Sequence, residues 1–195
     1  MFEISDIDLD RIEQLALREL ELRRMLHSLS TGQVLFKLYP PIGKKNARVI
    51  ALLHDIAHHW SGEELEAYIT KHNIKLEKGE EEKTILLHAP VGASILRELL
   101  PDAPKEWENA IRRHTIPHKD MSELSYALFV ADIIEPTRPF ITEDERNKVY
   151  NMSSNQERML YSMKQQEKFL IANGSSHLQC TQELCQILEK QLNRI

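Results

Sequence analysis

The residues best suited to chemistry in this chain are the neighbours His54 and Asp55, which interrupt the apolar run from Val49 to Ala57. The run has the composition of a buried helix, and burying an unpaired carboxylate beside an imidazole costs several kcal/mol. Both side chains therefore need partners inside the protein. A divalent cation is one such partner, because imidazole nitrogen and carboxylate oxygen both suit hard or borderline metal ions. The alternative is that neighbouring residues satisfy the pair, which is the more common outcome for a His-Asp pair taken alone.

Other polar residues occupy comparable positions elsewhere in the chain. Asp132 interrupts the apolar run from Ala127 to Ile134, just as Asp55 interrupts its own run. Three histidines are expected at the ends or on the apolar faces of helices: His27, His88 and His114. Taken singly, each has a structural interpretation as a core histidine or a helix cap. Two buried carboxylates on separate helices, together with four such histidines, instead predict a shared cation.

The bulk composition is that of an ordinary soluble globular protein. The chain has 195 residues, of which 42% are hydrophobic and 28% charged, enough for one domain with a sizeable core. Its net charge of −5 argues against broad nucleic-acid binding, which requires a basic face. Residues 1–8 lack the basic and apolar regions of a signal peptide, and no apolar run approaches the roughly 20 residues that span a membrane. Cys180 and Cys185 are expected to be reduced packing residues, which predicts a cytoplasmic protein.

The elements that must position these residues are expected to be helices. Glycine is scarce, with six in the chain, and no region alternates apolar and polar residues as a strand would. Helical spacing predicts an all-α, compact single domain over residues 1–195 with about eight or nine helices. Its core is expected at about 20–140, with C-terminal helices packing on it from 141–195. The expected helical stretches are 6–29, then from a break at 30–32 to about 38, 44–60, 63–72, 85–100, 107–114, 122–134, 143–152, 155–172 and 179–194.

The order His, His-Asp, Asp resembles the metal-binding signature of the HD-domain phosphohydrolase superfamily. Its four positions are filled by His27, His54, Asp55 and Asp132. The flanking sequences are similar to the YqeK-type branch, the HD-domain symmetrical diadenosine tetraphosphate hydrolases. The segments that carry this resemblance are Leu53-His-Asp-Ile-Ala57, His88-Ala-Pro-Val-Gly-Ala93, His114-Thr115, Met121-Ser122 and Ala131-Asp-Ile-Ile-Glu-Pro-Thr-Arg138.

The resemblance implies an all-helical enzyme that splits dinucleoside tetraphosphates such as diadenosine tetraphosphate (Ap4A) into two nucleoside diphosphates such as ADP. It implies a bound divalent metal, iron or otherwise manganese, on the four signature residues. One metal ion per chain is favoured, and a second ion on His88 and His114 is the alternative. The implied substrate-binding residues are Arg24, His58, His88, His114, Thr115 and Arg138. His88 and His114 are also the candidate proton donors, and a homodimer is compatible with the family.

The chain departs from the family pattern at a few positions. Ile116-Pro117 follows His114-Thr115 where the family has a small or hydroxyl residue and then glycine, and His58 replaces a common lysine. Thr181 is at most a remnant of a Pro-Asp-Thr pattern beside the nucleoside. These changes bear on nucleoside recognition and rate rather than on the metal site. Two other hypotheses follow: a different HD phosphohydrolase acting on mononucleotides or cyclic nucleotides, and a nucleotide-binding regulatory module with negligible turnover.

Several further residues have simpler interpretations. Arg24 and Arg138 are alternatively surface or helix-end ion pairs. The remaining histidines are expected at the surface: His59, His72, His118 and His177. Trp60 and Trp107 are expected in the core or at its rim rather than as a stacking platform for a base.

Overall fold

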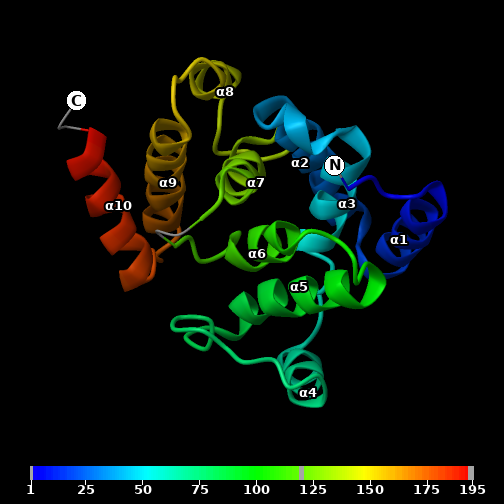
Figure 1. The fold of residues 1–195 in the computed structure, drawn as a ribbon. Coiled ribbons are helices and arrows are strands. Elements are labelled where there is room, and N and C mark those ends of the chain that lie inside the picture. The colour runs from blue at the N-terminus through cyan, green and yellow to red at the C-terminus, as the bar shows by residue number, and fades with distance from the viewer. Residues whose placement is uncertain (1, 119–120, 193–195) are drawn as a thin grey trace.

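The computed structural model describes residues 2–118 and 121–192, and within them every regular element is helical (Figure 1). There are ten α-helices and two 3₁₀ helices in these residues. The first half comprises α1 (Asp6–Glu19), α2 (Leu22–Leu38), η1 (Pro40–Ile42), α3 (Lys44–His54), α4 (Gly62–Lys71) and η2 (Thr84–Leu87). The second half comprises α5 (His88–Leu99), α6 (Lys105–Arg113), α7 (Glu123–Ile134), α8 (Glu143–Tyr150), α9 (Asn155–Ala172) and α10 (Gln179–Leu192). The all-α prediction is confirmed, with slightly more helices than expected.

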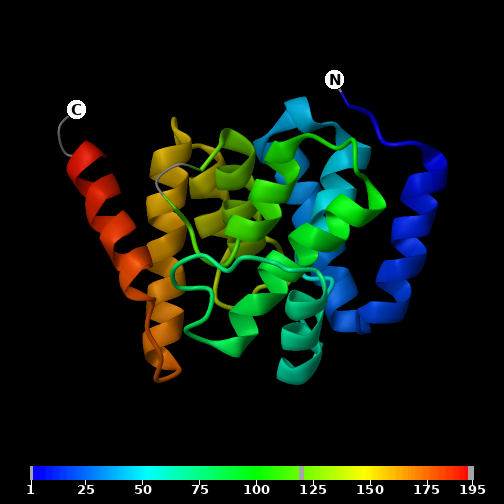
Figure 2. The same ribbon diagram turned by 60° about the horizontal axis from the view of Figure 1, so that its bottom comes forward.

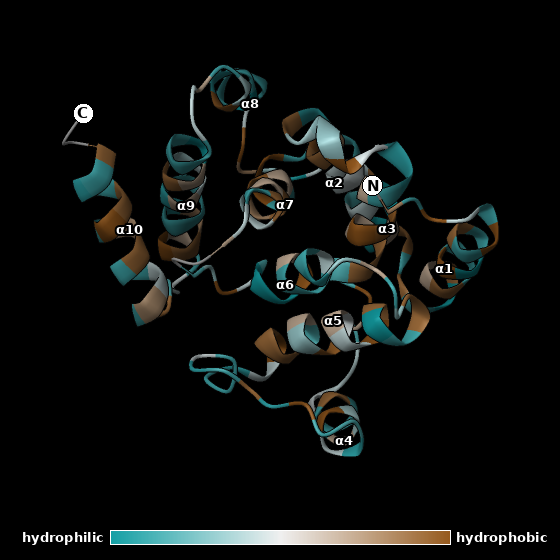
Figure 3. Ribbon diagram, viewed as in Figure 1, coloured by the Kyte–Doolittle hydropathy of each residue, from teal (hydrophilic) through white to brown (hydrophobic). Residues whose placement is uncertain are grey.

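Helix α7 is the centre of the fold. Every residue of α7 after Glu123 is buried, because α2, α6 and α9 pack around it. Figures 1 and 2 both place α1 and α10 at opposite ends of the molecule, so these two helices are the outermost layers. Figure 3 shows the same gradient in hydropathy, with α3 hydrophobic in the interior and α8 hydrophilic at the periphery. No helix in the described part of the chain combines the length and apolarity needed to cross a membrane.

The predicted break between the first two helices was placed wrongly. The chain leaves the helical conformation at Leu20, whose φ of −104° and ψ of 129° are extended, and α2 then runs unbroken through residues 30–32. Glu19, which interrupts the apolar stripe, is the last residue of α1. Gly32 does not end a helix. A Cβ there would lie 3.2 Å from the Cα of Arg48, so this glycine lets α2 pack closely on α3.

The His-Asp pair lies at the end of a helix rather than inside one. Helix α3 was expected to reach residue 60, but it ends at His54, and Asp55 is its C-cap with φ −109° and ψ 12°. The chain then continues as turns, so successive side chains leave the helical register. Helix α5 passes close beneath this end: a Cβ on Gly92 would lie 2.7 Å from the carbonyl oxygen of Leu53. The missing side chain at Gly92 therefore brings the start of α5 to the His-Asp turn.

Candidate metal centre

Three helices bring the four signature residues together in the interior. His27 comes from α2, His54 and Asp55 from the end of α3, and Asp132 from α7, and all four are buried. The Nε2 atom of His27 lies 2.9 Å from Oδ1 of Asp132 and 3.6 Å from Oδ2 of Asp55. The Nε2 atom of His54 lies 3.5 Å from Oδ2 of Asp55 and 3.7 Å from Oδ1 of Asp132. Two imidazole nitrogens and two carboxylate oxygens thus converge on one point.

A second cluster lies on the other side of Asp55. Its Oδ1 atom is 3.2 Å from Nε2 of His88 and 3.6 Å from Nε2 of His114. The two imidazole nitrogens are 3.1 Å apart. Both histidines are buried, with only 4% of their surface exposed. Asp55 therefore directs one oxygen toward each of two histidine groups, and each group has the spacing that could hold a metal ion.

Backbone carbonyl groups fix the orientation of three of the rings. The Nδ1 atom of His54 donates to the carbonyl of Ala51 at 2.6 Å, and that of His114 donates to the carbonyl of Ile111 at 2.6 Å. His88 is held in the same way by Ile85. Because a carbonyl oxygen accepts only, Nδ1 of each neutral ring carries the proton, and the Nε2 lone pair faces the clusters. The helical turn before each histidine thus pre-orients a nitrogen that could bind a metal ion.

The Nε2 atom of His54 supplies the test of whether these residues fit a metal ion. This nitrogen is buried and has no hydrogen-bond partner among the described residues. An unpaired buried polar atom is costly, yet this one faces two carboxylates that cannot donate a hydrogen bond to it. A divalent cation between His54, Asp55 and Asp132 would satisfy the lone pair and both negative charges. The donor set therefore fits a metal ion.

Glu135 is a member of this site whose role was not predicted. It follows α7, is fully buried, and its Oε1 atom accepts a hydrogen bond from Nδ1 of His27 at 3.0 Å. Its Oε2 atom accepts the backbone N–H of Thr137 at 2.6 Å. A carboxylate behind a ligating histidine fixes its tautomer and raises its basicity. Glu135 lies three residues after Asp132 at the end of an apolar run, which is the signal that could have identified it.

The charges within the site are strongly coupled. Burial opposes the protonation of His27, but hydrogen bonds with Asp132 and Glu135 outweigh it and raise the pKa of His27 to about 9. Burial would also raise the pKa of Asp55, yet the neighbouring His54, His114 and His88 hold it well below its ordinary value. The pKa of Asp132 is likewise held low against burial, mainly by Arg138. Both carboxylates are therefore ionised at neutral pH, as metal ligands must be.

The two predicted phosphate-binding arginines lie at the edge of the metal-ligand cluster. Nη1 of Arg24 donates to Oδ2 of Asp55 at 2.6 Å, and its Nη2 atom is 3.2 Å from Nε2 of His58. Arg138 donates through Nη2 to Oδ1 of Asp132 and through Nε to the Asp132 carbonyl at 2.8 Å. Both arginines thus form ion pairs with aspartates of the cluster, as the alternative interpretation of Arg24 and Arg138 expected. Both side chains also line a cavity of about 260 Å³ next to the cluster.

The other predicted residues lie at varying distances from this centre. The His58 ring is 4.9 Å from the His88 ring, and burial lowers the pKa of His58 to about 3, so this ring is neutral. Thr115 follows His114, and its hydroxyl has no hydrogen-bond partner in the described part of the chain. His118 is exposed as expected. His177 is not: it is buried in the segment between α9 and α10, with Nε2 3.1 Å from Oε1 of Gln166 on α9.

The two tryptophans and the remaining histidines have structural surroundings. Trp107 is buried in the core, and Trp60 packs against the core from its edge. His72 stacks on Tyr68 with ring centroids 4.0 Å apart, and His59 lies 3.9 Å from Glu21. His59 is exposed, as expected, whereas His72 is half-buried.

Comparison with known proteins gives consistent matches. The HD domain family model matches residues 24–137. A relative from Bacillus subtilis, named bis(5'-nucleosyl)-tetraphosphatase, symmetrical, is 29% identical over 156 residues, covering 79% of this chain and 83% of that protein. A relative of the same name from Halalkalibacterium halodurans is 36% identical over 118 residues, covering 57% of this chain and 59% of that protein.

A solved structure shares the whole fold. It is a predicted HD superfamily hydrolase from Clostridium acetobutylicum, described as involved in NAD metabolism. It superposes with a TM-score of 0.79 at 27% identity, covering 93% of this chain and 97% of that one. The similarity therefore includes the helices outside the residues that the family model matches.

Proposed function

This chain belongs to the HD domain family, and we propose that it hydrolyses diadenosine tetraphosphate symmetrically into two molecules of ADP. The observation that carries the proposal is the buried group of His27, His54 and Asp55, with Asp132 in contact with both histidines, beside an arginine-lined cavity. The names of the relatives from two bacilli support the substrate.

The four residues of this cluster would hold one divalent metal ion. A donor set of two imidazoles and two carboxylates suits iron or manganese. Such an ion, when bound, supplies Lewis-acid polarisation of a phosphoryl oxygen and a lowered pKa for water. The group formed by Asp55, His88 and His114 has the spacing for a second ion, so metal analysis decides between one and two ions per chain.

The arginines would exchange partners when the substrate binds. Arg24 and Arg138 each contact one ligand carboxylate, and a metal ion on Asp55 and Asp132 would neutralise those charges. The guanidinium groups would then be available for bidentate contacts with phosphate oxygens. They would hold the tetraphosphate with its central anhydride at the cluster.

The reaction breaks one bond and forms one. A water oxygen attacks one of the two inner phosphorus atoms, and the central P–O bond to the other inner phosphate breaks, giving two ADP molecules. Their Nε2 atoms place His88 and His114 beside Asp55. We assign to one of these histidines the transfer of a proton through its Nε2 atom, which takes the proton from the attacking water and gives it to the departing diphosphate.

The test is product analysis with purified protein. Incubation with manganese or ferrous iron and Ap4A should give ADP as the sole nucleotide product on ion-exchange chromatography. His54→Ala should lose this turnover, whereas His72→Ala, which changes a histidine outside the site, should keep it. Recovery of AMP and ATP would exclude symmetrical cleavage. Preferential cleavage of mononucleotides or cyclic nucleotides would indicate another HD phosphohydrolase, and tight ADP binding without turnover would indicate a regulatory module.

A further inference from the structure

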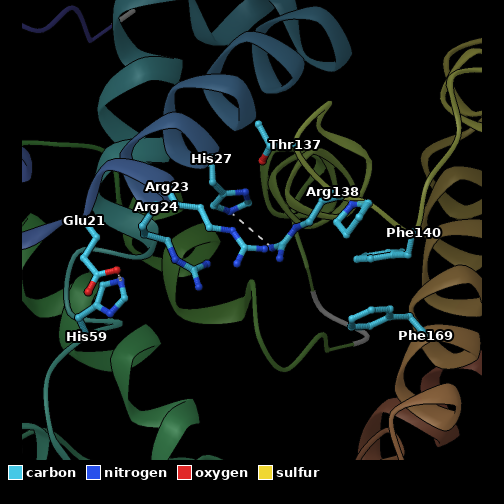
Figure 4. Close-up of a pocket in the computed structure, with 10 residues that line it drawn as sticks. Glu21, Arg23, Arg24, His27, His59, Thr137, Arg138, Phe140 and Phe169 are labelled. Atoms are coloured by element: carbon cyan, nitrogen blue, oxygen red, sulfur yellow. Dashed lines mark hydrogen bonds and ion pairs between the residues drawn. The ribbon is translucent and has the colours of Figure 1, made fainter.

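The cavity beside the metal-ligand cluster ends at a pair of stacked phenylalanines. Phe140 follows α7 and Phe169 lies on α9, and their ring centroids are 4.5 Å apart with planes inclined by 26°. Both rings line the cavity (Figure 4). Phe140 is partly buried, but 39% of Phe169 is exposed. A large aromatic ring left partly exposed in a cavity wall is a surface on which a planar group can stack.

The middle of the cavity is basic. The side chains of Arg23 and Arg138 extend toward one another there (Figure 4). Arg138 contacts Asp132, but Arg23 makes no ion pair or hydrogen bond with any other described residue. Glu21 also lines the cavity, and its Oε2 atom lies 3.9 Å from Nε2 of His59. Two guanidinium groups that face each other repel unless an anion lies between them.

The order of groups along the cavity follows the order of groups in a nucleotide. Arg138 touches the ligand Asp132 and lies 3.5 Å from Nε2 of His27. Arg23 lines the cavity beside it, and Phe140 comes two residues after Arg138. The sequence from the metal-ligand cluster outward is therefore acidic and imidazole ligands, then guanidinium groups, then aromatic rings. A nucleoside diphosphate presents phosphate and then base in the same direction.

We propose that this cavity receives one nucleoside diphosphate half of the substrate, with its base stacked on the Phe140–Phe169 pair and a phosphate between Arg23 and Arg138. The proposal rests on the proposed dinucleotide hydrolysis and adds where one half of the substrate binds. The cavity volume of about 260 Å³ lies below the roughly 300–1,000 Å³ of sites that enclose a whole drug-sized ligand. It therefore suits part of a dinucleoside tetraphosphate, with the other half outside.

Phe169→Ala tests the base subsite. The variant should raise the KM for Ap4A and the Kd for ADP about ten-fold, the usual effect of removing one aromatic stacking partner, with kcat and bound metal unchanged. The Kd for inorganic tripolyphosphate, which has no base, should not change. Phe169→Tyr should bind ADP as wild type does. Ile171→Ala, an exposed apolar residue on the same helix that does not line the cavity, is the matched control.

Arg23→Gln tests the phosphate subsite. It should raise the Kd for ADP and the Kd for tripolyphosphate by the same factor, about ten-fold for the loss of one charge-assisted contact. Arg18→Gln removes an exposed arginine outside the cavity and should weaken neither. Thermal melting of each variant identifies any loss of fold. If the Phe140–Phe169 pair were purely structural, its loss would lower the melting temperature and would affect the binding of ADP and of tripolyphosphate equally.

Base binding by the cavity and hydrolysis of Ap4A are tested by separate measurements. Unchanged ADP affinity in Phe169→Ala, or equal weakening of ADP and tripolyphosphate, overturns the base subsite even if wild type hydrolyses Ap4A. Conversely, base-dependent weakening of ADP binding supports the subsite even if wild type leaves Ap4A intact. Wild-type turnover is measured alone and decides only the hydrolase assignment.

Discussion

Glu135→Gln tests how the protein orients its candidate metal ligands. Glu135 is fully buried, and its two oxygens accept from Nδ1 of His27 at 3.0 Å and from the Thr137 N–H at 2.6 Å. A glutamine has a single acceptor oxygen, so its NH₂ group would face either the His27 N–H or the Thr137 N–H. The substitution therefore removes a charge and creates one donor–donor contact, while the side-chain volume hardly changes.

The magnitude follows from the hydrogen bond that His27 loses. A hydrogen bond to a charged group contributes about 1.5–3 kcal/mol and a neutral one about 0.5–1.5, so the difference is about 1–2 kcal/mol. At about 1.4 kcal/mol per factor of ten, metal affinity should fall roughly 10-fold or somewhat more, within the 10–100-fold typical of residues behind a metal ligand. Because Glu135 also helps to raise the pKa of His27, its loss lessens competition from protons. The drop in affinity should therefore be larger at about pH 8.5 than at about pH 6.5.

The assay is competition for Mn²⁺ between the protein and a chromophoric chelator. Glu108→Gln is the control, because Glu108 is a partly buried carboxylate that pairs with Arg97 and Lys105 and lies outside the metal-ligand cluster. It should cost stability without changing metal affinity. If Glu135→Gln binds Mn²⁺ as tightly as wild type, or if both variants lose affinity equally, the reasoning about Glu135 is refuted.

Three further predictions concern stability and reactivity. In chelator-treated protein, burial lowers the pKa of His27, but Asp132 and Glu135 outweigh burial and raise this pKa from 6.5 to about 9. The stability that the charged ring contributes is therefore fully present below pH 6.5 and is lost as the pH rises through about 9. A urea midpoint that does not fall over this interval would contradict this prediction. Gly92→Ala should destabilise the fold by about 1–3 kcal/mol, since its Cβ would lie 2.7 Å from a backbone oxygen, and an unchanged urea midpoint would show that the helices separate freely. Burial raises the pKa of the Cys185 thiol to about 11. In a Cys180→Ser variant, Cys185 should therefore react with a disulfide reagent much more slowly in the folded protein than in the unfolded protein. Equal rates in the two states would disprove this.

The candidate metal ligands were predictable because buried charge is conspicuous in a sequence. Asp55 and Asp132 each interrupt an apolar run, and in the structure both are buried. Asp55 lies beside His27, and Asp132 lies beside His54. The helix Asn155–Ala172 was also predicted with its exact bounds, since Ser154 with Glu157 forms a capping box and Gly174 follows its end.

Other features depend on tertiary packing, which local sequence does not reveal. Gly32 was taken as part of a helix break, yet it is small because α2 packs against α3 at that point. Glu135 has the appearance of a solvent-exposed residue before a proline until His27, 108 residues away, is placed against it. The Phe140–Phe169 pair joins residues from two distant segments, and neither lies in a pattern that distinguishes a stacking surface from a core.

Symmetrical, metal-dependent cleavage is tested most directly by hydrolysis of Ap4A in ¹⁸O-labelled water with manganese-loaded protein, followed by mass spectrometry of the nucleotides. We expect ADP alone, with one labelled oxygen on the terminal phosphate of half of the molecules, and no turnover after chelation or in His54→Ala. Labelled AMP or ATP would contradict symmetrical cleavage. Turnover that persists at the wild-type rate in His54→Ala would contradict the assignment of His54 and Asp55 as the centre of the site.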